Sequence, residues 1–225
     1  MISTVRSDSD DARHEAVSEL CDIYWYPVYS YFRKRGCSED DAKDLTQQLF
    51  ERFLEKDGFA AVDQDKGRLR SYLLTCATHL INENWRKQSR DKRGGGRTHI
   101  SIDQAIAEAR YRNEPRTDES PEKLFDRHWA LALLKHVEIR LEEEYAKRQP
   151  VRFRALKPFI PGDTWEVGFD RLAEKTGETA QVLRTQLSRY RKAYKRLLRE
   201  ELANTLHEGA DIDGEMESLR AALRR

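Results

Sequence analysis

Apolar side chains recur every three or four residues along most of the chain, and no segment alternates between apolar and polar residues. One stripe near the start consists of Leu20, Tyr24, Val28 and Phe32. A second stripe consists of Phe125, Trp129, Leu133, Val137, Leu141 and Tyr145. This spacing is typical of amphipathic helices, because one helix face repeats about every 3.6 residues. The sequence therefore predicts an all-α protein.

Start and stop signals divide this pattern into separate helices. Pro27 lies inside the first helix and is expected to kink or interrupt it, and Gly36 is expected to stop it. Ser38 is a typical N-cap for the second helix, and Pro121 suits the first turn of a later one. The predicted helices, in chain order, are Ala12–Lys34, a helix from Glu39 to about Lys56, Arg68–Arg90, a short helix near Ile102–Arg112, a helix from Pro121, Val151–Phe159, Phe169–Thr176, and a helix from Thr179.

Positive charge is concentrated in two blocks, although 41 basic and 40 acidic residues leave a net charge of only +1. The first block spans Arg86–Arg97 and the second spans Arg184–Arg199. Two separate basic blocks on a nearly neutral chain favour two contacts with a polyanion. A single basic run can equally be a solvated helix face, so the charge pattern leaves both interpretations open.

The helix expected over Arg68–Arg90 combines an apolar stripe with a polar row. The polar row consists of Thr75, His79, Asn82, Arg86 and Arg90. Spacings of three and four residues place these side chains on one face of a helix. The row is either a plain solvent-exposed face or a binding surface.

Residues 169–198 have the layout of a helix-turn-helix. Gly177 can adopt the positive φ that a tight turn between helices requires, and Thr179 can cap the helix that follows. The buried stripe of that helix is expected to be Leu183, Leu187, Tyr190, Tyr194 and Leu197. Gln181 and Arg184 lie on the opposite face, where such side chains can read base edges in the major groove.

Nothing in the sequence indicates catalysis or metal binding. The six histidines are scattered, the three cysteines form no C-x-x-C pair, and no phosphate-binding glycine loop is present. We therefore expect no enzyme activity, no metal and no cofactor. No run approaches the ~18 apolar residues of a membrane helix, and the start lacks the apolar stretch of a secretory signal, so a cytoplasmic protein is expected.

Several motifs together resemble the extracytoplasmic-function (ECF) type of RNA polymerase sigma factor, in the sigma-70 family. Residues 42–50 read AKDLTQQLF and are similar to the A-E-D-L-V-Q-E-V-F helix of sigma region 2, and residues 69–86 are similar to the helix that follows it. Residues 169–198 align without gaps with the helix-turn-helix of region 4. The middle of the chain resembles a branch of large ECF-like factors. Glu178 departs from the pattern, because the family usually has an apolar residue there, which predicts weaker packing at the turn.

The resemblance implies three groups of binding residues. Those that would bind the β′ clamp of core RNA polymerase are Asp44, Gln47, Gln48 and Glu51. Those that would face the minus-ten promoter element are His79, Asn82, Trp85, Arg86 and Arg90. Those that would face the minus-thirty-five element are Thr179, Gln181, Arg184, Thr185, Ser188, Arg189 and Lys192. Other implied partners are the polymerase β flap and an anti-sigma factor or kinase.

The implied organisation is two small helical domains joined by a flexible linker. Residues 1–93 would form region 2, residues 94–120 the linker, residues 121–206 region 4, and residues 207–225 a C-terminal tail. The implied function is promoter recognition and transcription initiation with core polymerase. A stand-alone helix-turn-helix regulator that binds duplex DNA without polymerase is the alternative, and a purely helical protein-interaction module is a third interpretation.

Overall fold

The structure is a computed structural model, and it describes residues 10–54, 68–88, 104–114, 117–161, 168–206 and 210–224. Within these ranges the chain is mostly helical and contains no β-strand, which confirms the predicted all-α class. The chain divides into two compact units. One consists of Met1–Ala132 together with Ala203–Arg225, and the other consists of Leu133–Leu202.

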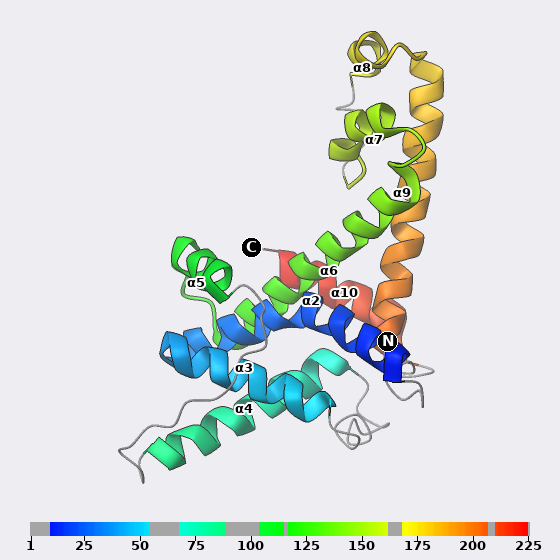
Figure 1. Cartoon of the computed structure of the whole chain (residues 1–225). Helices are drawn as coiled ribbons and strands as arrows, with labels where there is room; N and C mark the ends of the chain where they lie inside the picture. Colours follow the sequence, from blue (N-terminus) through cyan, green and yellow to red (C-terminus); the bar gives the residue numbers. More distant parts are fainter. Residues whose placement is uncertain are drawn as a thin grey trace. The chain divides into compact units, whose positions relative to one another are not determined.

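Three helices build the core of the first unit (Figure 1). They are α2 (Asp10–Lys34), α3 (Glu39–Leu54) and α4 (Leu69–Gln88). The predicted apolar stripe of α2 is buried, because Tyr24, Val28 and Phe32 are fully covered. Helices α3 and α4 both pack against α2, and Leu45 and Leu49 of α3 and Leu73 and Ala77 of α4 are buried as well. The periodicity in the sequence therefore identified the core of this unit.

The ends of these helices follow the local signals, with one exception. Gly36 has φ +91° directly after α2 ends, and the Ser38 hydroxyl accepts a hydrogen bond from the Asp41 backbone N–H at 3.1 Å. The exception is Pro27, which lies inside α2 without interrupting it. The Ser30 hydroxyl donates a hydrogen bond to the Pro27 carbonyl at 2.9 Å. The break that the sequence allowed at Pro27 is therefore absent.

A short helix, α5 (Gln104–Asn113), packs against α2 through buried charges. Glu108 is buried and accepts hydrogen bonds from the Tyr29 hydroxyl and from Arg33 Nη2, the latter at 3.1 Å. The bonds from Tyr29 and Arg33 counteract the cost of burying a carboxylate, and the pKa of Glu108 lies below its usual value. The segment predicted as a linker therefore contains a docked helix close to the expected one, whereas its first part, residues 94–103, lies outside the described residues.

The first three turns of α6 (Pro121–Tyr145) also belong to the first unit. Ser120 caps this helix by accepting from the Lys123 N–H at 3.3 Å. Trp129 is fully buried, and its indole N–H donates to the Tyr24 hydroxyl at 3.0 Å. Its ring also lies under the guanidinium group of Arg70, 4.9 Å from the ring centroid. These contacts join α6 to α2 and α4.

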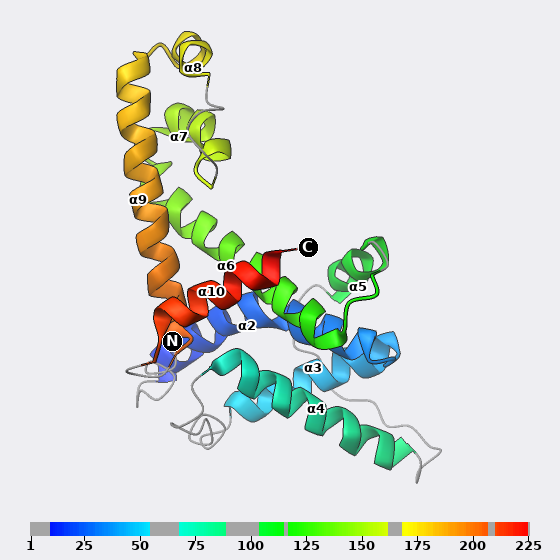
Figure 2. The ribbon, with the colours of Figure 1, turned by 180° about the vertical axis from the view of Figure 1, so that it is seen from behind.

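The last helix, α10 (Ile212–Leu223), lies beside α2 and the first part of α6, as the two opposite views show (Figures 1 and 2). Glu215 of α10 is only 1% exposed. Its carboxylate lies 2.7 Å from Nε of Arg70 and 3.0 Å from Nε of Arg68, both at the start of α4. Arg70 also binds Asp126 of α6 at 2.5 Å. A charged cluster, made of the buried Glu215 and the partly covered Arg70 and Asp126, therefore ties α4, α6 and α10 together.

The second unit contains the rest of α6, α7 (Pro150–Leu156), the 3-10 turn η1 (Lys157–Phe159), α8 (Phe169–Thr176) and most of α9 (Ala180–Asn204). Its core is built from Leu133, Val137, Leu141, Phe153, Leu183, Leu187, Tyr190 and Leu197. The Tyr190 ring lies 4.9 Å from the ring of Tyr145 and 5.4 Å from that of Phe153, measured between centroids. The long helix predicted from Thr179 is therefore anchored by aromatic contacts to α6 and α7.

The compact units do not follow the domain boundaries predicted from the sequence. The sequence placed residues 121–206 in one domain, but residues 121–132 and 203–206 pack with the first unit, as does α10. The physical reason lies in contacts between residues far apart in sequence. Trp129 contacts Tyr24, and the Leu69 N–H donates to the Thr205 carbonyl at 3.3 Å.

Candidate nucleic-acid interface

The predicted minus-ten residues lie on one exposed face of α4. Burial of Leu73, Ala77 and Leu80 turns the opposite face of this helix to solvent. The exposed side chains on that face are Thr75, His79, Asn82, Trp85 and Arg86. Arg90 lies outside the described residues, as does the rest of the first basic block from residue 89. The structure therefore brings four of the five predicted residues together on one helix.

Trp85 is the distinctive member of this face. Its side chain is 43% exposed, although tryptophan is usually largely covered in a folded protein. An exposed indole next to Asn82 and Arg86 offers stacking, hydrogen bonding and positive charge within one helical turn. These are the interactions through which proteins hold unpaired bases and their phosphates.

Arg35, at the end of α2, adds a cation to this face that the sequence analysis did not identify. Its guanidinium carbon lies 5.8 Å from the centroid of the Trp85 ring and 5.9 Å from that of Tyr31. Arg35 stands outside both basic blocks and directly after α2, whereas Trp85 lies on α4. Only the crossing of α2 and α4 brings the two side chains together.

The predicted polymerase-binding residues lie along α3. Asp44 and Glu51 are exposed, while Gln47 and Gln48 are half-buried. The Gln47 side-chain amide donates to the Glu51 carboxylate at 2.8 Å. These positions form a polar, acidic surface beside a helix face that is buried through Leu45 and Leu49.

The turn between α8 and α9 has the geometry that the sequence predicted. Gly177 ends α8 with φ +72°, and the Thr179 hydroxyl accepts from the Val182 N–H at 3.3 Å. Glu178, which was expected to weaken the turn, forms an ion pair with Arg152 of α7, with Nε 2.7 Å from Oε1. Both side chains are partly covered, so an ionic contact stands where the resemblance led us to expect an apolar residue.

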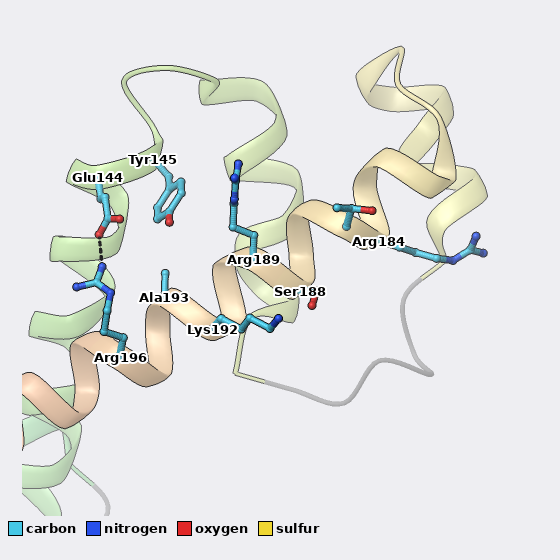
Figure 3. A pocket seen from close by; sticks show the side chains of 9 residues that line it. Glu144, Tyr145, Arg184, Ser188, Arg189, Lys192, Ala193 and Arg196 are labelled. Atoms are coloured by element: carbon cyan, nitrogen blue, oxygen red, sulfur yellow. Dashed lines mark hydrogen bonds and ion pairs between the residues drawn. The ribbon is translucent and has the colours of Figure 1, made fainter.

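The predicted minus-thirty-five residues are the cap residue Thr179 and six residues on the exposed face of α9. All seven of them, namely Thr179, Gln181, Arg184, Thr185, Ser188, Arg189 and Lys192, are exposed. Several line an open groove of about 680 Å³ together with Tyr145 and Ala193 (Figure 3). In Figure 3 the side chains of Arg184, Arg189 and Lys192 extend in different directions along the helix. This arrangement suits an extended polyanion better than one compact anion.

Two arginines of the second basic block bind other parts of the unit. Arg191 donates to the Phe159 carbonyl, with Nη2 at 2.7 Å, and so holds α9 against η1. Arg196 bonds to Glu144 and Glu200, both at 2.8 Å. Fewer cations of the second basic block therefore face solvent without a protein partner than the sequence alone suggests.

In the described part of the chain, no helix is long and apolar enough to cross a membrane.

Residues 26–91 match the family model of sigma-70 region 2. No curated protein and no solved structure matches the chain. The matched range begins inside α2 and includes all of α3 and α4, and therefore both the α3 surface and the exposed face of α4. The region 2 match supports the interpretation of the chain as a member of the sigma-70 family, with a role in transcription initiation and in binding core RNA polymerase.

Proposed function

We propose that the chain is a sigma factor of the ECF type, which binds core RNA polymerase and directs promoter recognition. One observation carries this proposal: the region 2 match and the exposed Trp85 face of α4 fall in the same three helices. The proposed site of action is the cytoplasm. The proposed chemistry involves no covalent step, because a protein that prefers the open strand shifts duplex DNA toward melting by binding energy alone.

In this proposal the α3 surface around Asp44 and Gln48 binds the β′ clamp, and the α4 face binds the minus-ten strand. An unpaired base stacks on Trp85, while Asn82 and Arg86 contact its edge and the backbone. Arg90 is part of the same proposed site. Base stacking on aromatic side chains is sequence-tolerant, so hydrogen bonds from His79 and Asn82 provide the discrimination.

The second proposed contact is the minus-thirty-five element, read by α9 after the turn at Gly177. Gln181 and Arg184 lie in the first turns of α9, the part of a recognition helix that enters the major groove. Arg189 and Lys192 follow further along and contact phosphates, which fix the register on the duplex. Other proposed partners are the β flap and, for regulation, an anti-sigma factor or a kinase.

In vitro transcription with sigma-free bacterial core polymerase tests the proposal. We expect the full chain to direct initiation at defined start sites, while core polymerase alone gives none.

The alternative function, a stand-alone helix-turn-helix regulator, is favoured by the α8–α9 geometry. If the chain binds duplex DNA specifically but neither joins core polymerase nor supports initiation, the alternative replaces the proposal.

Arg184→Ala is expected to weaken binding by about 1–3 kcal/mol at one promoter position and to relax selectivity there. The reason is that a guanidinium group at the start of a recognition helix can pair with the edge of a guanine. Binding to a set of promoters that differ at single positions measures the effect. Lys192→Ala is the matched control and should weaken all of them equally. An equal loss on every sequence for Arg184→Ala would show that Arg184 contacts only phosphate.

A further inference from the structure

Arg35 has a fixed place between two aromatic rings. It follows the last turn of α2, where its backbone N–H donates to the Tyr31 carbonyl at 2.9 Å, and Gly36 then turns the chain with φ +91°. The guanidinium carbon lies 5.9 Å from the ring centroid of Tyr31 and 5.8 Å from that of Trp85. Arg35 therefore connects the end of α2 to the exposed indole of α4.

A second contact fixes the crossing of the two helices at this place. The Tyr31 hydroxyl lies 3.0 Å from the hydroxyl of Thr78, on α4 two turns before Trp85. The Tyr31 ring also packs edge-on against the buried ring of Phe125, with 6.5 Å between the ring centroids. Because Tyr31 itself is 1% exposed, the ring on which Arg35 rests belongs to the core of the unit. Arg35 therefore contacts an aromatic ring that is buried in the core of the unit.

The charge of Arg35 is only weakly neutralised. Its Nη1 lies 3.8 Å from Oε1 of Glu122, and the two side chains are 30% and 46% exposed. An ion pair of this length and exposure contributes little, because water and salt screen it. A guanidinium group has five N–H donors, so one that rests on an indole can still bind a phosphate.

We propose that Arg35 is a positioning residue for Trp85 and a phosphate contact for single-stranded DNA; this inference rests on the proposed function. The guanidinium group covers part of the indole and holds it in one orientation, while the exposed part of the ring stays open to an unpaired base. Holding the ring in place before the base arrives reduces the ordering cost of binding. The same cation attracts the backbone phosphate next to the stacked base.

The test measures promoter opening by the full chain on core polymerase. The promoter is one mapped by the transcription experiment, and a fluorescent base analogue in the minus-ten strand reports melting. Arg35→Lys keeps the charge but loses the planar stacking group, and it should reduce opening about threefold to tenfold with an unchanged salt dependence. Arg35→Gln should reduce opening further and lower the slope of log K against log salt by about 0.7. Arg52→Gln, on an exposed arginine of α3 paired with Glu83, is the matched control and should behave like the wild type.

Double variants separate positioning from a general structural effect. If Arg35 acts through Trp85, then Arg35→Lys should add little in a Trp85→Ala background. A full additional loss in that background, or wild-type opening by Arg35→Lys, would overturn the inference. If Trp85→Ala impairs opening and Arg35→Lys does not, the proposed function stands without this inference. If the wild-type chain neither binds polymerase nor opens any promoter, both are overturned.

Discussion

Trp129→Ala is expected to destabilise the first unit by about 3–5 kcal/mol, because it removes a fully buried aromatic side chain and leaves a cavity. The substitution also leaves the Tyr24 hydroxyl without its indole donor and removes the ring beneath Arg70. Urea unfolding followed by circular dichroism measures the change in the free energy of unfolding. Hydrogen exchange of individual segments then shows where protection is lost.

The location of that loss also tests the observed division of the chain. We expect the greatest loss of protection in α2 and α4, although Trp129 lies in α6 and outside the matched residues 26–91. Leu131→Ala, two residues away at a position that is 45% exposed, is the control and should change stability by about 0.5 kcal/mol or less. If protection were lost in α7 and α8 while α2 and α4 kept theirs, Trp129 would belong with residues 133–202.

Arg70→Ala is the second substitution with a large expected effect, a loss of about 3–5 kcal/mol in the free energy of unfolding. The guanidinium group of Arg70 binds both Glu215 and Asp126, and its own side chain is only 11% exposed. Without it, Glu215 is left buried with Arg68 alone, whose side chain is 39% exposed. The melting temperature should fall by about 6–20 °C for a protein of this size.

A double-mutant cycle shows whether the buried charge is the cause. Arg70→Ala in a Glu215→Ala background should cost much less than in the wild type, because no unpaired buried carboxylate then remains. Arg220→Ala, which removes an exposed partner of Glu217 on the same helix, is the control and should have little effect. Additive losses from Arg70→Ala and Glu215→Ala would contradict the proposed coupling of the pair.

The local features of the fold could be read from the sequence because they depend on neighbouring residues. The stripe through Tyr24, Val28 and Phe32, the stop at Gly36 and the left-handed turn at Gly177 follow from helix periodicity and from the freedom of glycine to adopt positive φ. The exposed faces of α4 and α9 followed from the same periodicity, because burying one side of a helix fixes which residues the other side presents.

The features that could not be read depend on residues distant in sequence. Glu215 pairs with Arg70 across 145 positions, and Arg35 meets Trp85 only where two helices cross. Glu178 looked unfavourable at the turn because its partner, Arg152, is 26 residues away. The interruption that the sequence allowed at Pro27 is absent for another reason, since tertiary packing stabilises a continuous helix through it.

The order of the two units along the chain also affects synthesis on the ribosome. Residues 133–202 can fold as they leave the ribosome. At that stage Glu215 and the end of α9, which contact Arg70 and the start of α4, have not yet been made. The first unit, although it begins at the N-terminus, is completed only after residues 203–224 have been made. Contacts that close such long loops form late and slowly. The nascent chain therefore holds an incomplete first unit until Glu215 and the end of α9 have been made.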